Sequence, residues 1–100
     1  MIVEYTRYET ENGPALMRAY EEARLALDAS PNCLSYELSH CTEDPKWFIL
    51  RIEWDSAEGH LQGFRKSEVF GQFFAAVRPF LNEIREMRHY EVTSVISRKR

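Results

Sequence analysis

A tryptophan and a histidine lie close together in a part of the chain that is rich in aromatic residues. Trp54 ends a strand-like segment, His60 follows it, and phenylalanines come next, among them Phe64, Phe70 and Phe74. Imidazole titrates near neutral pH, so His60 is the candidate catalytic base by residue type. The indole N–H of Trp54 is a candidate donor to a substrate oxygen. The phenylalanines are candidate substrate-binding residues that would wall a small apolar pocket.

Each of these residues also has a purely structural explanation. His60 can be a surface residue of a helix, and Trp54 can be a core aromatic that closes a strand. Phenylalanines at helical spacing form a core more often than they clamp a substrate. A structure in which the imidazole faces solvent would favour this second interpretation.

Four more side chains complete the set of candidates. Arg7, in a strand among apolar neighbours, is the candidate catalytic cation. It could orient an anionic substrate or pair with Glu91 on a neighbouring strand. Tyr5 and Tyr36 are candidate substrate-binding residues that could donate a hydrogen bond or stack. His89 is a further candidate, and it would face either the pocket or a subunit interface.

Motifs for several other chemistries are absent from the sequence. It has no paired cysteines or His-Glu-x-x-His spacing for a metal, and no Gly-x-Ser-x-Gly nucleophile turn. No glycine-rich loop follows a strand in the phosphate-binding form. We therefore expect no metal and no tightly bound cofactor.

The elements that must position these side chains follow from hydrophobic periodicity. Alternation predicts strands at 2–9, 33–41, 47–54 and 84–97, and three- to four-residue spacing predicts helices at 14–28, 57–63 and 67–81. Glu37 and Arg51 would form a cross-strand ion pair in the central hairpin. The order β-α-β-β-α-β predicts an α+β, ferredoxin-like fold, with an antiparallel sheet and helices on one face.

The sheet would then have a face that no helix covers. Its strands carry apolar or aromatic residues on both sides, so we expect a homodimer formed by sheet-to-sheet packing, as in a dimeric α/β barrel. The last strand is long enough to cross to the partner chain. A small-molecule ligand would bind in each subunit, between the sheet and the helices.

Composition limits the remaining classes of function. The 100 residues suit a single domain spanning 1–100, and the net charge of −3 argues against a nucleic-acid partner. No run approaches the roughly 20 apolar residues of a membrane span. Met1 leads directly into a strand-like segment without a basic leader, so we expect a cytoplasmic protein without a membrane partner.

Taken together and in order, residues along most of the chain resemble the antibiotic biosynthesis monooxygenase (ABM) domain family of dimeric α/β-barrel proteins. They are residues 32–38, Asp44, Pro45, Phe48, residues 52–54, His60, residues 64–67, Phe70 and residues 87–90. The resemblance implies a fold shared by cofactor-independent oxygenases of polycyclic aromatic or quinol substrates, haem-degrading enzymes and isomerases of small phosphorylated signals.

The haem-degrading branch is not expected. Its members place a tryptophan where this chain has Phe64 and an iron-ligating histidine where it has Phe74. They also place an asparagine in the first strand, at the position of Thr6 or Arg7. All three residues differ here.

Two hypotheses from different classes follow. In the first, the protein is a cofactor-independent monooxygenase of a small aromatic or quinone-like molecule, with His60 as base and Trp54 and Arg7 as orienting groups. In the second, it is a non-catalytic dimeric module that binds or senses a small molecule. The first requires His60, Trp54 and Arg7 to converge on one cavity.

Overall fold

The computed structural model describes residues 1–99 and has the element order that the sequence predicts. The elements are β1 (Ile2–Glu9), α1 (Gly13–Ala29), β2 (Cys33–His40), β3 (Trp47–Trp54), η1 (Gly59–Phe64), α2 (Val69–Val77), η2 (Arg78–Glu83) and β4 (Ile84–Glu91). No helix within residues 1–99 is both long enough and apolar enough to cross a membrane.

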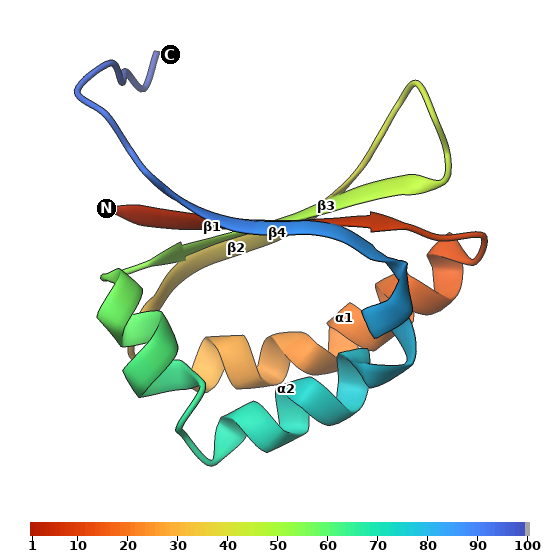
Figure 1. Ribbon diagram of the computed structural model, residues 1–100, viewed down its shortest axis with the longest axis horizontal. Coiled ribbons are helices and arrows are strands. Elements are labelled where there is room, and N and C mark those ends of the chain that lie inside the picture. Colours follow the sequence, from red (N-terminus) through yellow and green to blue (C-terminus); the bar gives the residue numbers. More distant parts are fainter. Residues whose placement is uncertain (100) are drawn as a thin grey trace.

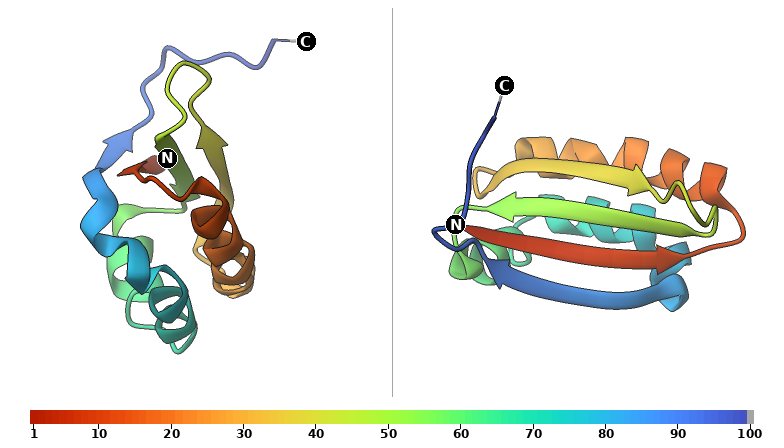
Figure 2. Two further views of the ribbon diagram at one scale, coloured as in Figure 1. Left: turned by 90° about the vertical axis from the view of Figure 1, so that its right-hand side faces the viewer. Right: turned by 90° about the horizontal axis from the view of Figure 1, so that it is seen from above.

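The four strands form one antiparallel sheet in the order β2-β3-β1-β4, and α1 and α2 cover one of its faces (Figures 1 and 2). This is the ferredoxin-like α+β arrangement, so the predicted fold is confirmed. Strand β1 is central: Tyr5 lies opposite Arg51 of β3 and opposite Arg88 of β4. Both neighbours hold β1 in register, and its side chains therefore occupy the middle of each face.

Alternation along β1 decides which residues reach the space under the helices. Glu4, Thr6 and Tyr8 point toward the helices and are buried, whereas Arg7 lies on the opposite face and is exposed. Successive residues of a strand point to opposite faces, so this division follows from the register alone. A carboxyl group is thereby placed in the interior of the protein.

Helix α1 begins where its sequence favours it. The side chain of Asn12 accepts the backbone N–H of Ala15 at 3.2 Å, and Pro14 occupies the first turn. The helix buries one face against the sheet, through Leu16, Tyr20, Ala23, Ala26 and Leu27. That stripe is part of the core, which also contains Tyr8, Phe48, Leu50, Ile52, Trp54, Phe64, Val77 and Phe80.

The connection from β3 to α2 is a π-helical turn, η1, that packs against the end of the sheet. The hydroxyl of Ser56 accepts the N–H of Gly59 at 2.8 Å and so begins this turn. The wider π-helical spacing places His60 and Phe64 on the same buried side. The helix predicted at 57–63 therefore exists, but its hydrogen-bond pattern is different.

Two predicted elements are shorter than expected. The helix predicted at 67–81 is α-helical over Val69–Val77 and then tightens into η2, because Pro79 lacks the N–H that would continue it. Strand β4 ends at Glu91 rather than at residue 97. Glu91 pairs with Ile2, and the N–H of Val92 bonds to Met1, where β1 begins. Beyond that point β4 has no neighbour, and the tail leaves the sheet on the face opposite the helices (Figure 1).

The predicted ion pairs have mixed outcomes. Glu37 lies opposite Arg51, with 3.7 Å between their charged groups, as expected. Arg7, however, pairs with Glu86 at 3.9 Å and not with Glu91. The strand register places Glu86 opposite Arg7 and places Glu91 opposite Ile2, five residue pairs away.

Candidate functional site

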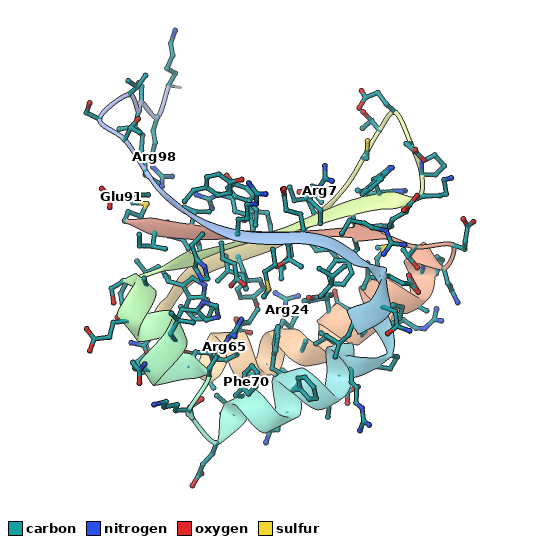
Figure 3. All side chains as sticks on the ribbon, in the orientation of Figure 1. Arg7, Arg24, Arg65, Phe70, Glu91 and Arg98 are labelled. Atoms are coloured by element: carbon teal, nitrogen blue, oxygen red, sulfur yellow. The ribbon has the colours of Figure 1, made fainter. Side chains whose placement is uncertain are left out.

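A cavity of about 210 Å³ lies between the sheet and the second helical layer. Its floor comes from β1, β3 and β4, and its roof comes from η1, α2 and η2. Figure 3 shows Arg65 and Phe70 on this helical side of the sheet, whereas Arg7 points away from the opposite side. The polar residues of the cavity gather mainly at its two ends, with Thr6 of β1 between them, and the rest of the lining is apolar or aromatic.

The first polar group is a buried cluster around the carboxylate of Glu4. The indole N–H of Trp54 donates to Oε1 of Glu4 at 3.0 Å, and the His60 ring stacks on Trp54 with 4.4 Å between the ring centroids. The Nε2 atom of His60 lies 3.6 Å from the same carboxylate oxygen. Glu4 and His60 are 4% and 3% exposed, so both groups are removed from bulk water.

Arg65 and His89 fix the tautomer of His60. The Nε–H of Arg65 points at Nε2 of His60 at 3.3 Å, and an arginine nitrogen can only donate. Nε2 is therefore the acceptor, and the proton of a neutral His60 is on Nδ1. That N–H donates to Nε2 of His89 at 2.6 Å. His89 is exposed, so a chain of imidazoles connects the cavity wall to the surface.

The cluster shifts the pKa values of both buried groups. Burial raises the pKa of Glu4, against the lowering effects of the Trp54 hydrogen bond and of electrostatic interactions with His89 and Arg65. Burial lowers the pKa of His60 to about 4, and the charges of Arg65 and His89 act in the same direction. His60 is therefore neutral at pH 7, and its contact with Glu4 is not an ion pair. Glu4 is the group whose pKa moves toward neutrality.

Glu4, His60 and His89 also resemble a metal ligand set, because one ligand atom from each lies within 4.8 Å of the others. Two nitrogens bound to one tetrahedral zinc would be about 3.4 Å apart. The imidazole nitrogens are only 2.6 Å apart, and the guanidinium of Arg65 donates to His60 where a cation would compete. These atoms are arranged as a hydrogen-bonded chain and do not fit a metal.

Aromatic side chains form the apolar wall that the sequence predicts. The Phe64 ring packs edge-on against Phe70 at 5.5 Å and against Phe73 at 5.4 Å. Phe74 is 40% exposed and also lines the cavity. The wall is therefore rigid at Phe64, which is fully buried, and more open where Phe74 meets solvent.

The second polar group is a pair of tyrosines, Tyr8 from β1 and Tyr20 from α1. Their hydroxyl oxygens are 2.5 Å apart, and both residues line the cavity. Burial raises the pKa of Tyr8 to about 12 and raises the pKa of Tyr20 well above its usual value. Both groups remain phenols at any physiological pH.

Five of the residues singled out from the sequence line this cavity, and the others lie elsewhere. The five are Trp54, His60, Phe64, Phe70 and Phe74. His89 touches the site only through its hydrogen bond to His60. The expected convergence of Arg7 with His60 and Trp54 is wrong, because odd-numbered residues of β1 face away from the helices. Arg7 lies over the Trp47 ring instead, and Tyr5 packs edge-on against Tyr90.

Tyr36 also lies outside the cavity. Its strand, β2, is at the sheet edge under α1, where its hydroxyl donates to Asp28 at 2.5 Å and accepts from Arg24 at 3.1 Å. The indole of Trp54 differs from expectation as well, because its N–H is bonded to Glu4 and orients a protein group.

Sequence reasoning missed Glu4, Arg65, Tyr8 and Tyr20. The available signal was the alternation of β1, which places Glu4, Thr6 and Tyr8 on one face. Nothing in the spacing of Arg65 indicates that its guanidinium reaches a buried histidine.

A model of the family described as antibiotic biosynthesis monooxygenase matches residues 1–76 of the chain. The chain belongs to this family. Among curated proteins, the uncharacterized protein YczJ of Bacillus subtilis (strain 168) is 25% identical over 73 residues, which are 73% of this chain and 77% of YczJ. The function of that relative is not described by its name.

Solved ABM structures share the fold. A putative antibiotic biosynthesis monooxygenase from Chloroflexus aurantiacus J-10-fl superposes with a TM-score of 0.74 at 19% identity, over 96% of each chain. SnoaB, a cofactor-independent oxygenase from Streptomyces nogalater, superposes with a TM-score of 0.72 at 10% identity, over 96% of this chain and 94% of SnoaB. At these identities the likeness establishes the ABM fold and leaves the substrate open.

Proposed function

We propose that this ABM protein is a cofactor-independent monooxygenase that oxidises a small hydroxylated aromatic molecule. The observation that carries the proposal is the buried carboxylate of Glu4, held by Trp54 at one end of an aromatic-walled cavity, with a raised pKa. A perturbed acid beside a cation in a cavity is typical of a catalytic base. The description of SnoaB as a cofactor-independent oxygenase supports the same reaction class.

Glu4 is a better base than His60 in this geometry. The Nε2 lone pair of His60 already accepts a hydrogen bond from Arg65, and a pKa of about 4 makes the imidazole a weak proton acceptor. Glu4 has a second carboxylate oxygen besides the one that Trp54 holds. In this proposal Trp54 and His60 are positioning residues, since they orient Glu4 and Arg65.

The reaction needs no reductant other than the substrate. Glu4 removes the hydroxyl proton, and Arg65 stabilises the resulting oxyanion in a cavity with few polar groups. The electron-rich anion transfers an electron to O₂, and the radical pair combines to form a ring C–O bond. The peroxide O–O bond then breaks. One oxygen atom stays on the ring as a carbonyl, and the other leaves as water with two substrate hydrogens.

The volume of the cavity limits the substrate to one or two rings. An apolar protein cavity of about 150 Å³ accepts benzene. This cavity, at about 210 Å³, is only moderately larger. A bicyclic phenol with its hydroxyl at Glu4 is the substrate class that size and polarity favour.

We also propose that two copies of the chain associate through the helix-free face of the sheet. Residues of this face include Tyr5 and Tyr90, whose rings are 5.5 Å apart, and Trp47. Tyr90 is 45% exposed in the single chain, which a partner sheet would cover. Sedimentation at micromolar concentration should give twice the mass of the chain, and a Tyr90→Asp variant should shift toward monomer. A wild-type monomer would contradict this association.

The oxygenase proposal can be tested with 1-naphthol and ¹⁸O₂. The expected result is uptake of one O₂ per molecule, with one ¹⁸O in 1,4-naphthoquinone and the other in water. Glu4→Gln should reduce the rate by at least about a hundredfold, because a positioned base contributes roughly that much. The amide oxygen of Gln can still accept the Trp54 N–H. Glu22→Gln, on the exposed surface of α1, is the matched control. Binding of naphthols without O₂ uptake would instead favour a non-catalytic binding module.

A further inference from the structure

The Tyr8–Tyr20 pair has one proton more than its own hydrogen bond can use. Two phenol groups carry two O–H protons, and the 2.5 Å contact between their oxygens uses one of them. Within residues 1–99, neither hydroxyl makes a second hydrogen bond to the protein. A buried O–H without an acceptor is costly, so the remaining proton requires an acceptor that the chain does not supply.

Two spaces within the described residues 1–99 border the tyrosine pair, the cavity and the groove beside it. Tyr8 is 1% exposed and lines the cavity, and Tyr20 lines both spaces. The groove already has its own polar network, in which Tyr36 bonds to Asp28 and Arg24. The cavity, which both tyrosines line, is therefore the space in which a bound molecule would present an acceptor to this proton.

The tyrosine pair lies at the other end of the cavity from Glu4. Glu4 and Tyr8 are on the same face of β1, four residues apart, so their Cα atoms are about 13 Å apart along the strand. Glu4, Tyr8 and Tyr20 nevertheless line the same cavity, so their side chains face a common space. Thr6 and Leu50, which lie opposite each other on β1 and β3, line the region between the two ends.

We infer that the Tyr8–Tyr20 hydroxyl pair is a subsite that donates a hydrogen bond to a carbonyl oxygen of the substrate, at the opposite edge from the hydroxyl that faces Glu4. This inference rests on the proposed function for the role of Glu4. A carbonyl is favoured over a second hydroxyl because it supplies lone pairs without adding another proton that needs an acceptor. The ligand class is therefore a bicyclic hydroxyketone with its two oxygens on opposite edges.

A matched pair of probes isolates the carbonyl. 6-Hydroxy-1-tetralone has a hydroxyl and a carbonyl on opposite edges of two fused rings, and 5,6,7,8-tetrahydro-2-naphthol lacks only the carbonyl. Calorimetric titration without O₂ measures both dissociation constants. The wild-type protein should bind the ketone about tenfold more tightly, which is the value of one net hydrogen bond at a buried site.

Phenylalanine variants of Tyr8 and Tyr20 then test whether the two hydroxyls cause the preference for the ketone. In Tyr8→Phe/Tyr20→Phe the preference for the ketone should fall to within about twofold, because both donors are gone and both rings remain. Each single variant keeps one hydroxyl and should retain part of the preference. Tyr36→Phe, which removes a hydroxyl in the neighbouring groove, should leave the ratio unchanged. Thermal unfolding of each variant establishes that it is folded.

The outcomes separate this inference from the oxygenase proposal. Equal binding of the two probes by the wild-type protein, or an unchanged ratio in the double variant, would overturn the subsite. A tenfold ratio that depends on the tyrosines would support the subsite even if no O₂ is consumed. Turnover of 1-naphthol with no preference for the ketone would support the oxygenase and reject the subsite.

Discussion

The Nδ1 atom of His60 lies 2.6 Å from Nε2 of His89, so a buried imidazole in η1 is hydrogen-bonded to an exposed imidazole in β4. Arg65 occupies the other nitrogen of His60, which sets the direction of the chain: His60 donates and His89 accepts. Protonation of His89 would place two N–H groups face to face. The link therefore exists only while both imidazoles are neutral.

Replacement of His89 should test this link directly. His89→Ala leaves a buried N–H of His60 without an acceptor, so the free energy of unfolding should fall by about 1–3 kcal/mol. His89→Gln offers a carbonyl oxygen to the same N–H and should recover part of that loss. Urea unfolding at pH 7.5 gives both values. Equal stability of the Ala and Gln variants would show that the bond contributes nothing. In the wild type, ¹⁵N NMR should find the His60 proton on Nδ1.

The burial of neutral His60 predicts a dependence of stability on pH. The pKa of His60 is about 4 in the folded protein and about 6.5 in a free side chain. Above pH 6.5 both states are neutral, and the stabilisation is fully present. Between pH 6.5 and 4 the unfolded chain takes up a proton that the folded protein does not, so stability is lost, up to about 3 kcal/mol. Below pH 4 both states are protonated and this loss stops growing.

Carboxyl groups also titrate in this pH range, so a variant is needed to isolate the contribution of His60 to the free energy of unfolding. His60→Gln cannot titrate at this position. The difference in free energy of unfolding between wild type and His60→Gln should therefore change by roughly 2–3 kcal/mol between pH 7.5 and 4.5, to the disadvantage of the wild type at low pH. Urea titrations at both pH values measure it. A difference that is independent of pH would mean that His60 titrates normally in the folded state.

The fold was predictable from the sequence because periodicity is a property of many residues together. The two-residue period of β1 and the helical period of α1 each extend over whole elements, so a single exception such as Glu4 does not obscure them. The end of β4 was not predictable in this way. Val92 to Ile96 have strand propensity, but the pairing of β4 with β1 ends at Glu91 opposite Ile2, and propensity does not show where a neighbouring strand ends.

Residues of the site were predictable from the sequence only where residue type alone determines whether a side chain is buried. Large aromatics such as Trp54 and Phe64 are favoured in the interior, and their rings meet at the cavity. For charged residues the sequence gives no comparable rule. Arg7 and Glu4 look equally exposed in the pattern of β1, and the coverage of one face by helices decides that Glu4 is buried. The cation of the site, Arg65, depends on the path of the π-helical turn.

Trp54→Phe should change the pKa of Glu4. Burial raises this pKa and the indole N–H lowers it through its hydrogen bond, so removing that bond while keeping an aromatic ring should raise the pKa further. A ¹³C NMR titration of the Glu4 carboxyl measures the change without any substrate. If the proposed function is correct, the acidic limb of the pH–rate profile should move upward by the same amount. Trp47→Phe, on the opposite face of the sheet, should change neither the pKa of Glu4 nor the pH–rate profile.

Two glycines in the same half of the chain should respond oppositely to alanine. A Cβ at Gly63 would collide with the side chain of Asn32, whose amide donates to Asp55 at 3.0 Å and fixes the start of η1. Gly63→Ala should therefore cost about 1–3 kcal/mol through displacement of Asn32. A Cβ at Gly71, within α2, would meet nothing within 4 Å. Gly71→Ala should stabilise the protein by about 0.5–1 kcal/mol, the difference in helix propensity.

These two substitutions separate close packing from helix propensity, because both remove a glycine from helical sequence. If Gly63 were only a weak point of its helix, alanine would stabilise the protein at both positions. Thermal and urea unfolding of the two variants distinguish the explanations by the sign of the change. The loss at Gly63 should also loosen η1, which carries His60 and Phe64, so the His60 Nδ1–H of Gly63→Ala should exchange with solvent faster than in Gly71→Ala.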